Sequence, residues 1–278
     1  MQRRLVFSVF LVSVASLSAV SQIDSTRCSF FPQRILFTPL LANHEEPRLG
    51  VQQEIGTSRM RIGIGNMVDA VEYSVGRDTV RWGVDFFAYA LSNDFKGARF
   101  QIDAADGFFG MHFVYANGSP LSLRFRIVHF SAHFVDGHYD GDNMKWRDQR
   151  NPVPFSRNYG ELVAAYTINT AQFSVRLYSG CSYAAVVKPA DIQPFTTIHG
   201  IEIRSQGQIR VYVADDFSLV GVPRYSGSNN IEAGVKFGPW PERGVRIFLN
   251  YFSGLDNFGQ YYNIRKDRWG IGFTFDFW

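Results

Sequence analysis

Apolar and polar residues alternate one by one through much of the C-terminal half of this chain, and this period of two constrains the fold most. The segment 173–178 places Phe, Val and Leu at alternate positions, with Arg176 among the residues between them. Segments 209–214 and 245–252 repeat the pattern, each again with one arginine on the polar face. Because successive side chains of a β-strand point to opposite faces, each segment predicts a strand with one apolar and one polar face. The arginines on the polar faces are Arg176, Arg210 and Arg246.

The last segment of the chain shows the same alternation with larger side chains. Residues 269–277 place five bulky apolar residues on one face and Gly, Gly, Thr and Asp on the other, before Trp278. On the edge of a soluble sheet such a face would promote aggregation. In a membrane β-barrel it faces lipid, and an aromatic C-terminal strand is typical of outer-membrane barrels. We therefore expect residues 269–278 to be the strand that the barrel assembly machinery recognises.

The links between the predicted strands alternate in length. From residue 120 onward a long link is followed by a short one, which is typical of bacterial barrels with short periplasmic turns and long extracellular loops. A soluble secreted β-sandwich, the alternative fold, gives no reason for this alternation. The long links are 136–157, 184–194, 217–229 and 254–267, and the short ones are 169–170, 205–207 and 238–243.

These patterns predict an all-β, antiparallel transmembrane β-barrel of about 12 strands, within a range of about 10–14. The region 57–106 is the least regular and sets that range. The expected strands are 47–65 (one long strand within it), 68–76, 79–91, 108–116, 120–135, 158–168, 171–183, 195–205, 207–217, 229–238, 244–254 and 268–277.

The N-terminus predicts export. Arg3 and Arg4 precede an apolar stretch over 5–17, and Ala19 and Ser21 supply the small residues of a cleavage site. We therefore expect residues 1–21 to be a signal peptide, 22–46 a periplasmic N-terminal segment and 47–278 a barrel in the bacterial outer membrane. The two cysteines, at positions 28 and 181, are weak support for a disulfide and we expect them to be free. The net charge of +3 is too small to indicate a nucleic-acid partner.

One constellation of residues could carry chemistry. His129, Ser131 and His133 stand two residues apart, so all three side chains leave the same face of one strand. Glu161 begins the next predicted strand at the same height. Strict alternation from Arg126 turns the three outward to lipid, whereas a β-bulge near Ile127-Val128 would turn them into the lumen. In the lumen, His129, Ser131, His133 and Glu161 would form a polar cluster with Asp136 and Arg126.

Several segments resemble a family of exported bacterial β-barrel proteins defined only as a domain of unknown function. They are residues 37–43, 46–48, 124–133, 155–162, 251–254 and 259–260. The resemblance spans nearly the whole mature chain and implies the barrel fold, without an activity. It departs from the family near the histidines, where this chain has Val135-Asp136-Gly137-His138 in place of a Gly-Asp-Glu run.

The pair His129 and Ser131 is also similar to the active site of lipid A 3-O-deacylases, barrels that cleave an acyl ester in the outer leaflet. That resemblance implies Ser131 as nucleophile, His129 as its base, and Glu161 or Asp136 as the group that orients the imidazole.

Three functional readings remain. The first is a structural or pore-type, ligand-binding barrel. The second is an outer-membrane lipid hydrolase that uses Ser131 and His129, and the third is the soluble secreted β-sandwich. In the first two, the partners are outer-membrane lipids and lipopolysaccharide. No metal or other cofactor is expected, since the aspartates of 136–142 lack the ligand spacing of a known calcium motif.

Overall fold

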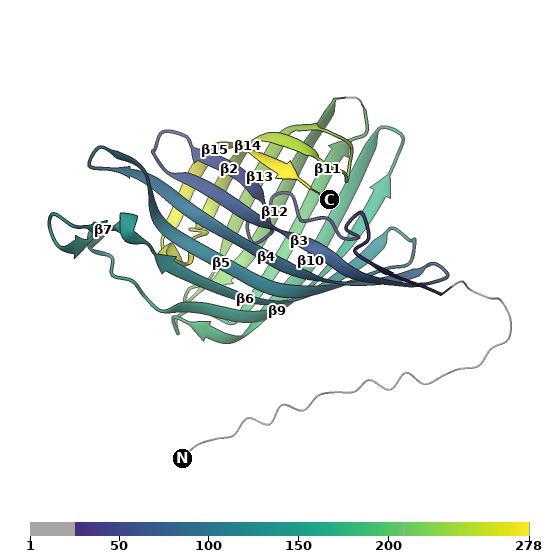
Figure 1. The fold of residues 1–278 in the computed structure, drawn as a ribbon, viewed down its shortest axis with the longest axis horizontal. Helices are drawn as coiled ribbons and strands as arrows, with labels where there is room; N and C mark the ends of the chain where they lie inside the picture. The colour runs from purple at the N-terminus through teal and green to yellow at the C-terminus, as the bar shows by residue number, and fades with distance from the viewer. Residues whose placement is uncertain (1–25, 208, 278) are drawn as a thin grey trace, which may run out of the picture.

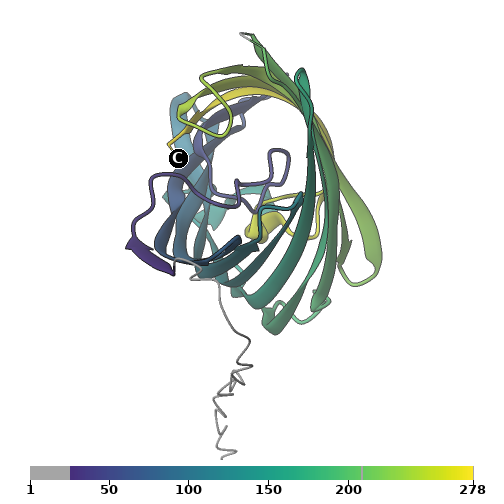
Figure 2. The same ribbon diagram turned by 90° about the vertical axis from the view of Figure 1, so that its right-hand side faces the viewer.

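A computed structural model describes residues 26–207 and 209–277, and its main feature is one closed antiparallel barrel of twelve strands (Figures 1 and 2). The predicted strand number is therefore confirmed. The predicted signal peptide, 1–21, lies outside the described residues. The barrel strands are β2 (Leu49–Glu54), β3 (Met60–Val75), β4 (Asp78–Phe95), β5 (Ala98–Ala116), β6 (Leu121–Phe134), β9 (Phe155–Asn169), β10 (Phe173–Lys188), β11 (Phe195–Ser205), β12 (Arg210–Gly221), β13 (Tyr225–Phe237), β14 (Gly244–Leu255) and β15 (Arg265–Asp276).

The barrel closes between its first and last strands. Strand β15 pairs with β2, from Gly270 opposite Glu54 to Phe275 opposite Leu49. The short strand β1 (Arg27–Phe30) pairs with the far end of β3, which extends beyond β2. Every barrel strand thus has a neighbour on both sides along at least part of its length, which removes the open edges that a sheet would expose.

The faces of the strands are the reverse of those in a soluble protein. Large apolar side chains stand exposed on the outer face, and charged side chains point inward and are buried. On β15, Trp269 and Phe273 face outward while Thr274 and Asp276 face inward, as the alternation predicts. An apolar exterior around a polar interior is the arrangement of a transmembrane β-barrel, so the soluble sandwich is wrong. Examples of outward residues are Ile64, Phe86, Met111, Leu162, Val213, Ile247, Leu249 and Ile271.

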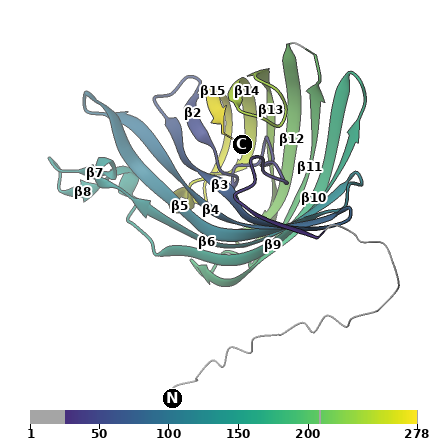
Figure 3. The same cartoon turned by 45° about the vertical axis from the view of Figure 1, so that its right-hand side comes forward.

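The connections distinguish two ends of the barrel. The turn end carries five hairpin turns, and the loop end carries the two longest links, 135–154 and 256–264, together with short ones at 96–97 and 222–224 (Figure 1). The longest link, 135–154, contains η1 (Asp136–His138), the hairpin β7–β8 (Tyr139–Asp140 and Lys145–Trp146) and η2 (Arg147–Gln149). This hairpin stands away from the barrel wall in Figure 3. A further short helix, η3 (Gly259–Tyr261), lies in the link between β14 and β15.

One predicted link and one predicted strand are wrong. The long link expected at 217–229 is only three residues, 222–224, because β12 continues to Gly221 and β13 begins at Tyr225. The long strand expected within 47–65 is broken by a turn at 55–59, where Gly56 adopts a left-handed φ of 83°. Glycine reaches that conformation without the steric cost of a Cβ atom.

The N-terminal segment enters the barrel. The chain leaves β1 at the turn end, passes through the lumen and emerges as β2 (Figure 2). The sequence predicts a periplasmic N-terminal segment over 22–46 and gives no sign that residues 36–48 pack inside the barrel. Within residues 26–207 and 209–277, no helix has the length and hydropathy needed to cross a bilayer.

Candidate functional site

Residues 36–48, here called the plug, fill the middle of the lumen without forming regular secondary structure. Phe37, Leu40 and Ala42 are at most 1 % exposed. Because the plug has no strand partner, its backbone groups must find other hydrogen bonds. The N–H of Leu36 donates to Asp69 Oδ2 at 2.9 Å, and the N–H of Leu41 donates to Glu202 Oε1 at 2.7 Å. Carboxylates of the barrel wall thus accept the hydrogen bonds that a neighbouring strand would otherwise accept.

A buried ion cluster binds the returning arm of the plug to one side of the wall. Arg124 Nη1 donates to Glu46 Oε2 at 2.9 Å, and Arg126 Nη2 donates to Glu161 Oε2 at 2.7 Å. Arg124 Nη2 also reaches Glu161 Oε1 at 3.1 Å. All four side chains are almost fully buried, so each charge depends on its partners for the solvation that it has lost.

The opposite side of the wall holds the plug equally firmly. Arg48 Nη1 donates to Glu232 Oε2 at 2.7 Å, and Asn43 Nδ2 donates to Asp216 Oδ2 at 3.1 Å. Asn230 Nδ2 donates to the carbonyl oxygen of Ala42 at 2.6 Å. The plug is therefore bonded to β6 on one side and to β12 and β13 on the other, and it crosses the lumen between them.

An aromatic ring also holds the plug in place. The Phe37 ring lies between two guanidinium groups, with Arg124 Cζ at 4.6 Å and Arg176 Cζ at 4.3 Å from its centroid. Contacts of this kind are attractive and strengthen when water is excluded. The ring fixes the entering arm of the plug to the same arginine that binds Glu46 on the returning arm.

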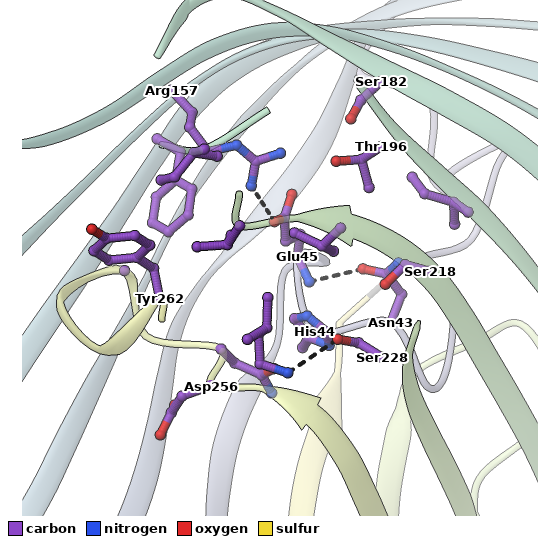
Figure 4. A pocket seen from close by; sticks show the side chains of 18 of the residues that line it. Asn43, His44, Glu45, Arg157, Ser182, Thr196, Ser218, Ser228, Asp256 and Tyr262 are labelled. Atoms are coloured by element: carbon purple, nitrogen blue, oxygen red, sulfur yellow. Dashed lines mark hydrogen bonds and ion pairs between the residues drawn. The ribbon is translucent and has the colours of Figure 1, made fainter. Parts of the chain in front are cut away.

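The plug separates two cavities. On the turn-end side a cavity of about 250 Å³ is lined by Phe37, Thr38, Arg176, Arg204 and Trp240, among others. On the loop-end side a cavity of about 80 Å³ lies above the tip of the plug, residues 43–45 (Figure 4). The loop-end cavity, so named from here on, is the candidate site because the plug, the wall and three loops all contribute to it.

Two walls of different chemistry face each other across the loop-end cavity. One carries hydroxyl groups from four neighbouring strands: Ser182 of β10, Thr196 of β11, Ser218 of β12 and Ser228 of β13 (Figure 4). The other carries Arg157, Phe155 and Tyr262. The hydroxyl wall follows from register, because Ser182 pairs with Thr196 and Ser218 pairs with Ser228.

Glu45, at the plug tip, is held in its ionised form. Arg157 Nη1 donates to its Oε1 at 2.8 Å and the Tyr159 hydroxyl donates to its Oε2 at 3.0 Å. Burial opposes ionisation, but the charge of Arg157 and these hydrogen bonds outweigh it, so the pKa of Glu45 lies below its ordinary value. The neighbouring His44 behaves oppositely: burial, with the charges of Arg61 and Arg268, lowers its pKa well below the ordinary value and keeps the ring neutral.

The structure turns the predicted histidine–serine group toward lipid. Strand β6 pairs with β5 and β9 without a register shift, so it contains no bulge. Because Arg126 faces the lumen, strict alternation turns His129, Ser131 and His133 to the outer face. His129 Nδ1 lies 2.5 Å from Asn158 Oδ1 on β9. Glu161 points into the lumen, where both of its oxygens are bound by arginines, so it does not orient His129.

The predicted polar cluster of His133, Asp136 and Arg126 is not brought together. Arg126 is luminal, whereas His133 is exposed on the outer face and Asp136 is exposed in η1. Asp136 accepts a hydrogen bond from the N–H of Gly137, its neighbour in the chain. The physical reason is again the strict alternation of β6, which sends residues 126 and 133 to opposite faces. Cys28 and Cys181 are both free, as expected.

Two buried histidines that the sequence analysis did not single out lie inside the barrel. His112 contacts Asp85 Oδ1 at 2.7 Å and Asp69 Oδ1 at 2.8 Å. His138, from the long loop, contacts Asp103 Oδ1 at 2.7 Å and stacks on Phe134. The inward position of His112 on β5 was the available signal, but its carboxylate partners stand on other strands. Nowhere in the described chain do three His, Cys, Asp or Glu side chains gather so that they could hold a metal ion.

Comparison with known proteins gives a family match without an activity. The sequence matches, over residues 13–277, a family described as a protein of unknown function (DUF1207). No protein with a curated description matches the chain.

Two similar solved structures share little sequence with this chain. The beta domain of the Bordetella autotransporter Brka is 10% identical, with a TM-score of 0.46, covering 82% of this chain and 96% of that one. OmpT of Vibrio cholerae, an outer-membrane protein, is also 10% identical, with a TM-score of 0.38, covering 92% of this chain and 99% of that one.

Proposed function

The chain belongs to the DUF1207 family of proteins of unknown function, and we propose that this member is an outer-membrane pore-type barrel whose own N-terminal plug keeps it closed. The observation that carries the proposal is the path of residues 36–48. They cross the lumen and bind β6 on one side and β12 and β13 on the other.

The size of the barrel supports this proposal. Eight strands leave an interior that side chains alone can fill, whereas sixteen leave an aqueous channel. Twelve strands lie between these cases, and here a segment of the chain itself occupies the extra space. Cavities of about 250 Å³ and about 80 Å³ on the two sides of the plug mark the two ends of a blocked passage.

The outer surface supports residence in the bacterial outer membrane. The exposed apolar belt suits a lipid environment that includes lipopolysaccharide, and the aromatic face of β15 suits recognition by the barrel assembly machinery. On this proposal residues 269–278 are the assembly signal, as the sequence analysis expects.

Conductance across a planar lipid bilayer tests the closed-pore proposal. We expect the wild-type protein to pass almost no current, and a variant in which residues 37–47 are replaced by a Gly-Ser linker of equal length to show discrete openings. A matched control replaces residues 139–149 of the long loop by the same linker and should stay closed. Equal currents from wild type and the plug variant would overturn the proposal.

A second candidate function is hydrolysis of an outer-leaflet lipid by Ser131 and His129. The favouring observation is that both side chains stand on the lipid-facing surface of β6, where such a substrate would lie. Asn158, rather than Glu161, contacts His129 Nδ1, and an Nδ1–H donated to Asn158 would leave Nε2 free to accept the serine proton. Side chains two residues apart on a strand begin about 7 Å apart, so both must lean together.

Mass spectrometry of lipid A separates the two functions. Cells that express the wild-type chain are compared with cells that express Ser131→Ala, with equal amounts of folded barrel in each. Loss of one acyl chain in the first and not in the second would establish hydrolysis. Identical lipid A in both would remove this candidate and leave the closed pore.

A further inference from the structure

Three hydroxyl groups of the loop-end cavity have no hydrogen-bond partner in the described chain. Ser182, Thr196 and Ser218 are 3 %, 8 % and 7 % exposed, yet no protein atom bonds to their side chains. Their neighbour Ser228 differs, because its Oγ accepts a hydrogen bond from the N–H of Leu255 at 3.2 Å. The three hydroxyls line the cavity, so this wall can offer hydrogen bonds to a molecule that enters it.

The charged groups around the same cavity are already paired. Arg157 binds Glu45, Glu161 binds Arg126, and Asp256 Oδ2 accepts from Arg59 at 3.0 Å. An anion or a cation entering the cavity would have to break one of these pairs or stand beside a like charge. The charges thus disfavour an ionic ligand, while the free hydroxyls favour a polar one.

Two further groups that line the cavity have unused hydrogen-bonding capacity and no charge. His44 Nδ1 and Asn257 Oδ1 are buried without a partner. The imidazole is neutral, since burial lowers the pKa of His44 well below its ordinary value. Phe155 and Tyr262, which also line the cavity, add flat apolar surface. The cavity therefore combines neutral donors and acceptors with aromatic faces.

We propose that the loop-end cavity binds a small, neutral, hydroxyl-rich molecule, a polyol or a monosaccharide. Such a molecule carries donors and acceptors on neighbouring carbons, which matches hydroxyls on the neighbouring strands β10, β11 and β12. Its C–H faces suit Phe155 and Tyr262. A volume of about 80 Å³ holds about six waters at roughly 10–15 Å³ each, the scale of a small polyol or a compact sugar. The proposal goes beyond the closed pore and does not depend on it.

Saturation-transfer NMR on the detergent-folded full-length protein tests the proposal with defined probes. Glycerol, D-xylose and D-glucose are the neutral probes. D-Glucuronate and D-glucosamine are the charged ones, each sharing the glucose ring. We expect transfer to at least one neutral probe, competed by the other neutral probes, and binding of the charged sugars about tenfold weaker.

Substitutions then place the binding in the cavity. Thr196→Val and Ser218→Ala remove hydroxyls with little change in shape, and each should weaken binding about tenfold. Ser174→Ala is the matched control: Ser174 is also a buried, unpartnered hydroxyl of β10, but it lines the turn-end cavity, and its loss should leave binding unchanged. A change in gel mobility on heating, which folded barrels show, confirms that every variant is folded.

The contrary outcomes are equally clear. No transfer to any neutral probe would overturn the proposal, because the hydroxyls would then be satisfied by water alone. Preference for glucuronate or glucosamine would overturn the neutral ligand, and equal loss in Ser174→Ala would overturn the location. A conducting wild-type barrel that still binds D-glucose would contradict only the closed pore.

Discussion

At the residue scale, the buried ions of the lumen are stabilised by partners far away in the sequence. Arg124 lies on β6 and its partner Glu46 lies in the plug, 78 positions earlier. Both are fully buried, so removing one takes from the other its nearest counter-charge in a medium of low polarity, and Arg124 would keep only Glu161, at 3.1 Å.

Removing one charge of this cluster should destabilise the folded protein. Glu46→Gln keeps the shape of the side chain but leaves Arg124 without its full counter-charge. We expect the free energy of unfolding to fall by about 3 kcal/mol, the scale for breaking a buried ion pair. Urea unfolding in lipid vesicles measures it. The control is Glu242→Gln, which breaks an exposed pair with Arg34 and should cost about 0–1 kcal/mol; equal costs would show that the plug cluster is not a buried ion pair.

The plug tip should make stability depend on acidity. The pKa of Glu45 is lower in the folded protein than its ordinary value of 4.5, because Arg157, Tyr159 and Arg126 outweigh the effect of burial. Its contribution is therefore complete above pH 4.5 and is lost as the pH falls through the folded pKa. We expect Glu45→Gln to melt at a lower temperature than wild type at pH 7, and the difference to shrink as the pH falls below 4.5. A difference that does not change between pH 7 and pH 3 would contradict this role.

The residues of the loop-end cavity show the limit of a single sequence. His129, Ser131 and His133 stand out because they are close together along the chain. Ser182, Thr196 and Ser218 meet only through the pairing of three strands. Asn43 and Glu45 reach them only because the chain turns inside the barrel. Such a set depends on register and on the path of the plug, and neither is a local property.

At the element scale, strand type and face follow from the sequence, while strand ends do not. Alternation fixed the inward side of Arg176 and Arg246 and the outward side of Trp269 and Phe273. The upstream strands β4 and β5 are longer than predicted because polar residues at their loop ends, such as Asn93 and Asp103, are buried inside the barrel. In this environment a polar residue does not signal the end of a strand.

The lipid-facing side of β14 gives a direct test of the faces. Leu249 stands mid-strand on the outer face, so Leu249→Arg should cost about 2–4 kcal/mol in lipid vesicles. Phe237→Arg, at the turn end of β13, is the control and should cost about 0–1 kcal/mol near the interface. Equal costs would mean that β14 does not cross the bilayer as the barrel requires.

At the scale of the whole molecule, the plug fills a lumen that the barrel wall alone would leave open. A closed sheet alone would enclose a polar lumen, and the outward apolar belt would be the same with or without residues 36–48. The sequence therefore predicts the barrel, because lipid imposes a periodic pattern on its exterior. The filling of the lumen depends on hydrogen bonds between the plug and eight strands, β3, β4, β6 and β9 to β13, which leave no period along the chain.

Limited proteolysis of the detergent-folded protein tests whether the plug stays in place. Trypsin should cut first in the long loop, after the exposed Lys145, because this segment stands away from the barrel wall (Figure 3). Arg48 is 9 % exposed and bound to Glu232, so cleavage after it requires the plug to leave the lumen. We expect the Arg48 site to resist until the barrel unfolds, and the Glu46→Gln variant to be cut there sooner. Cleavage of wild type after Arg48 as fast as after Lys145 would mean that the plug leaves the folded barrel readily. The ion pairs between the plug and the wall would then not be explained by a closed resting state.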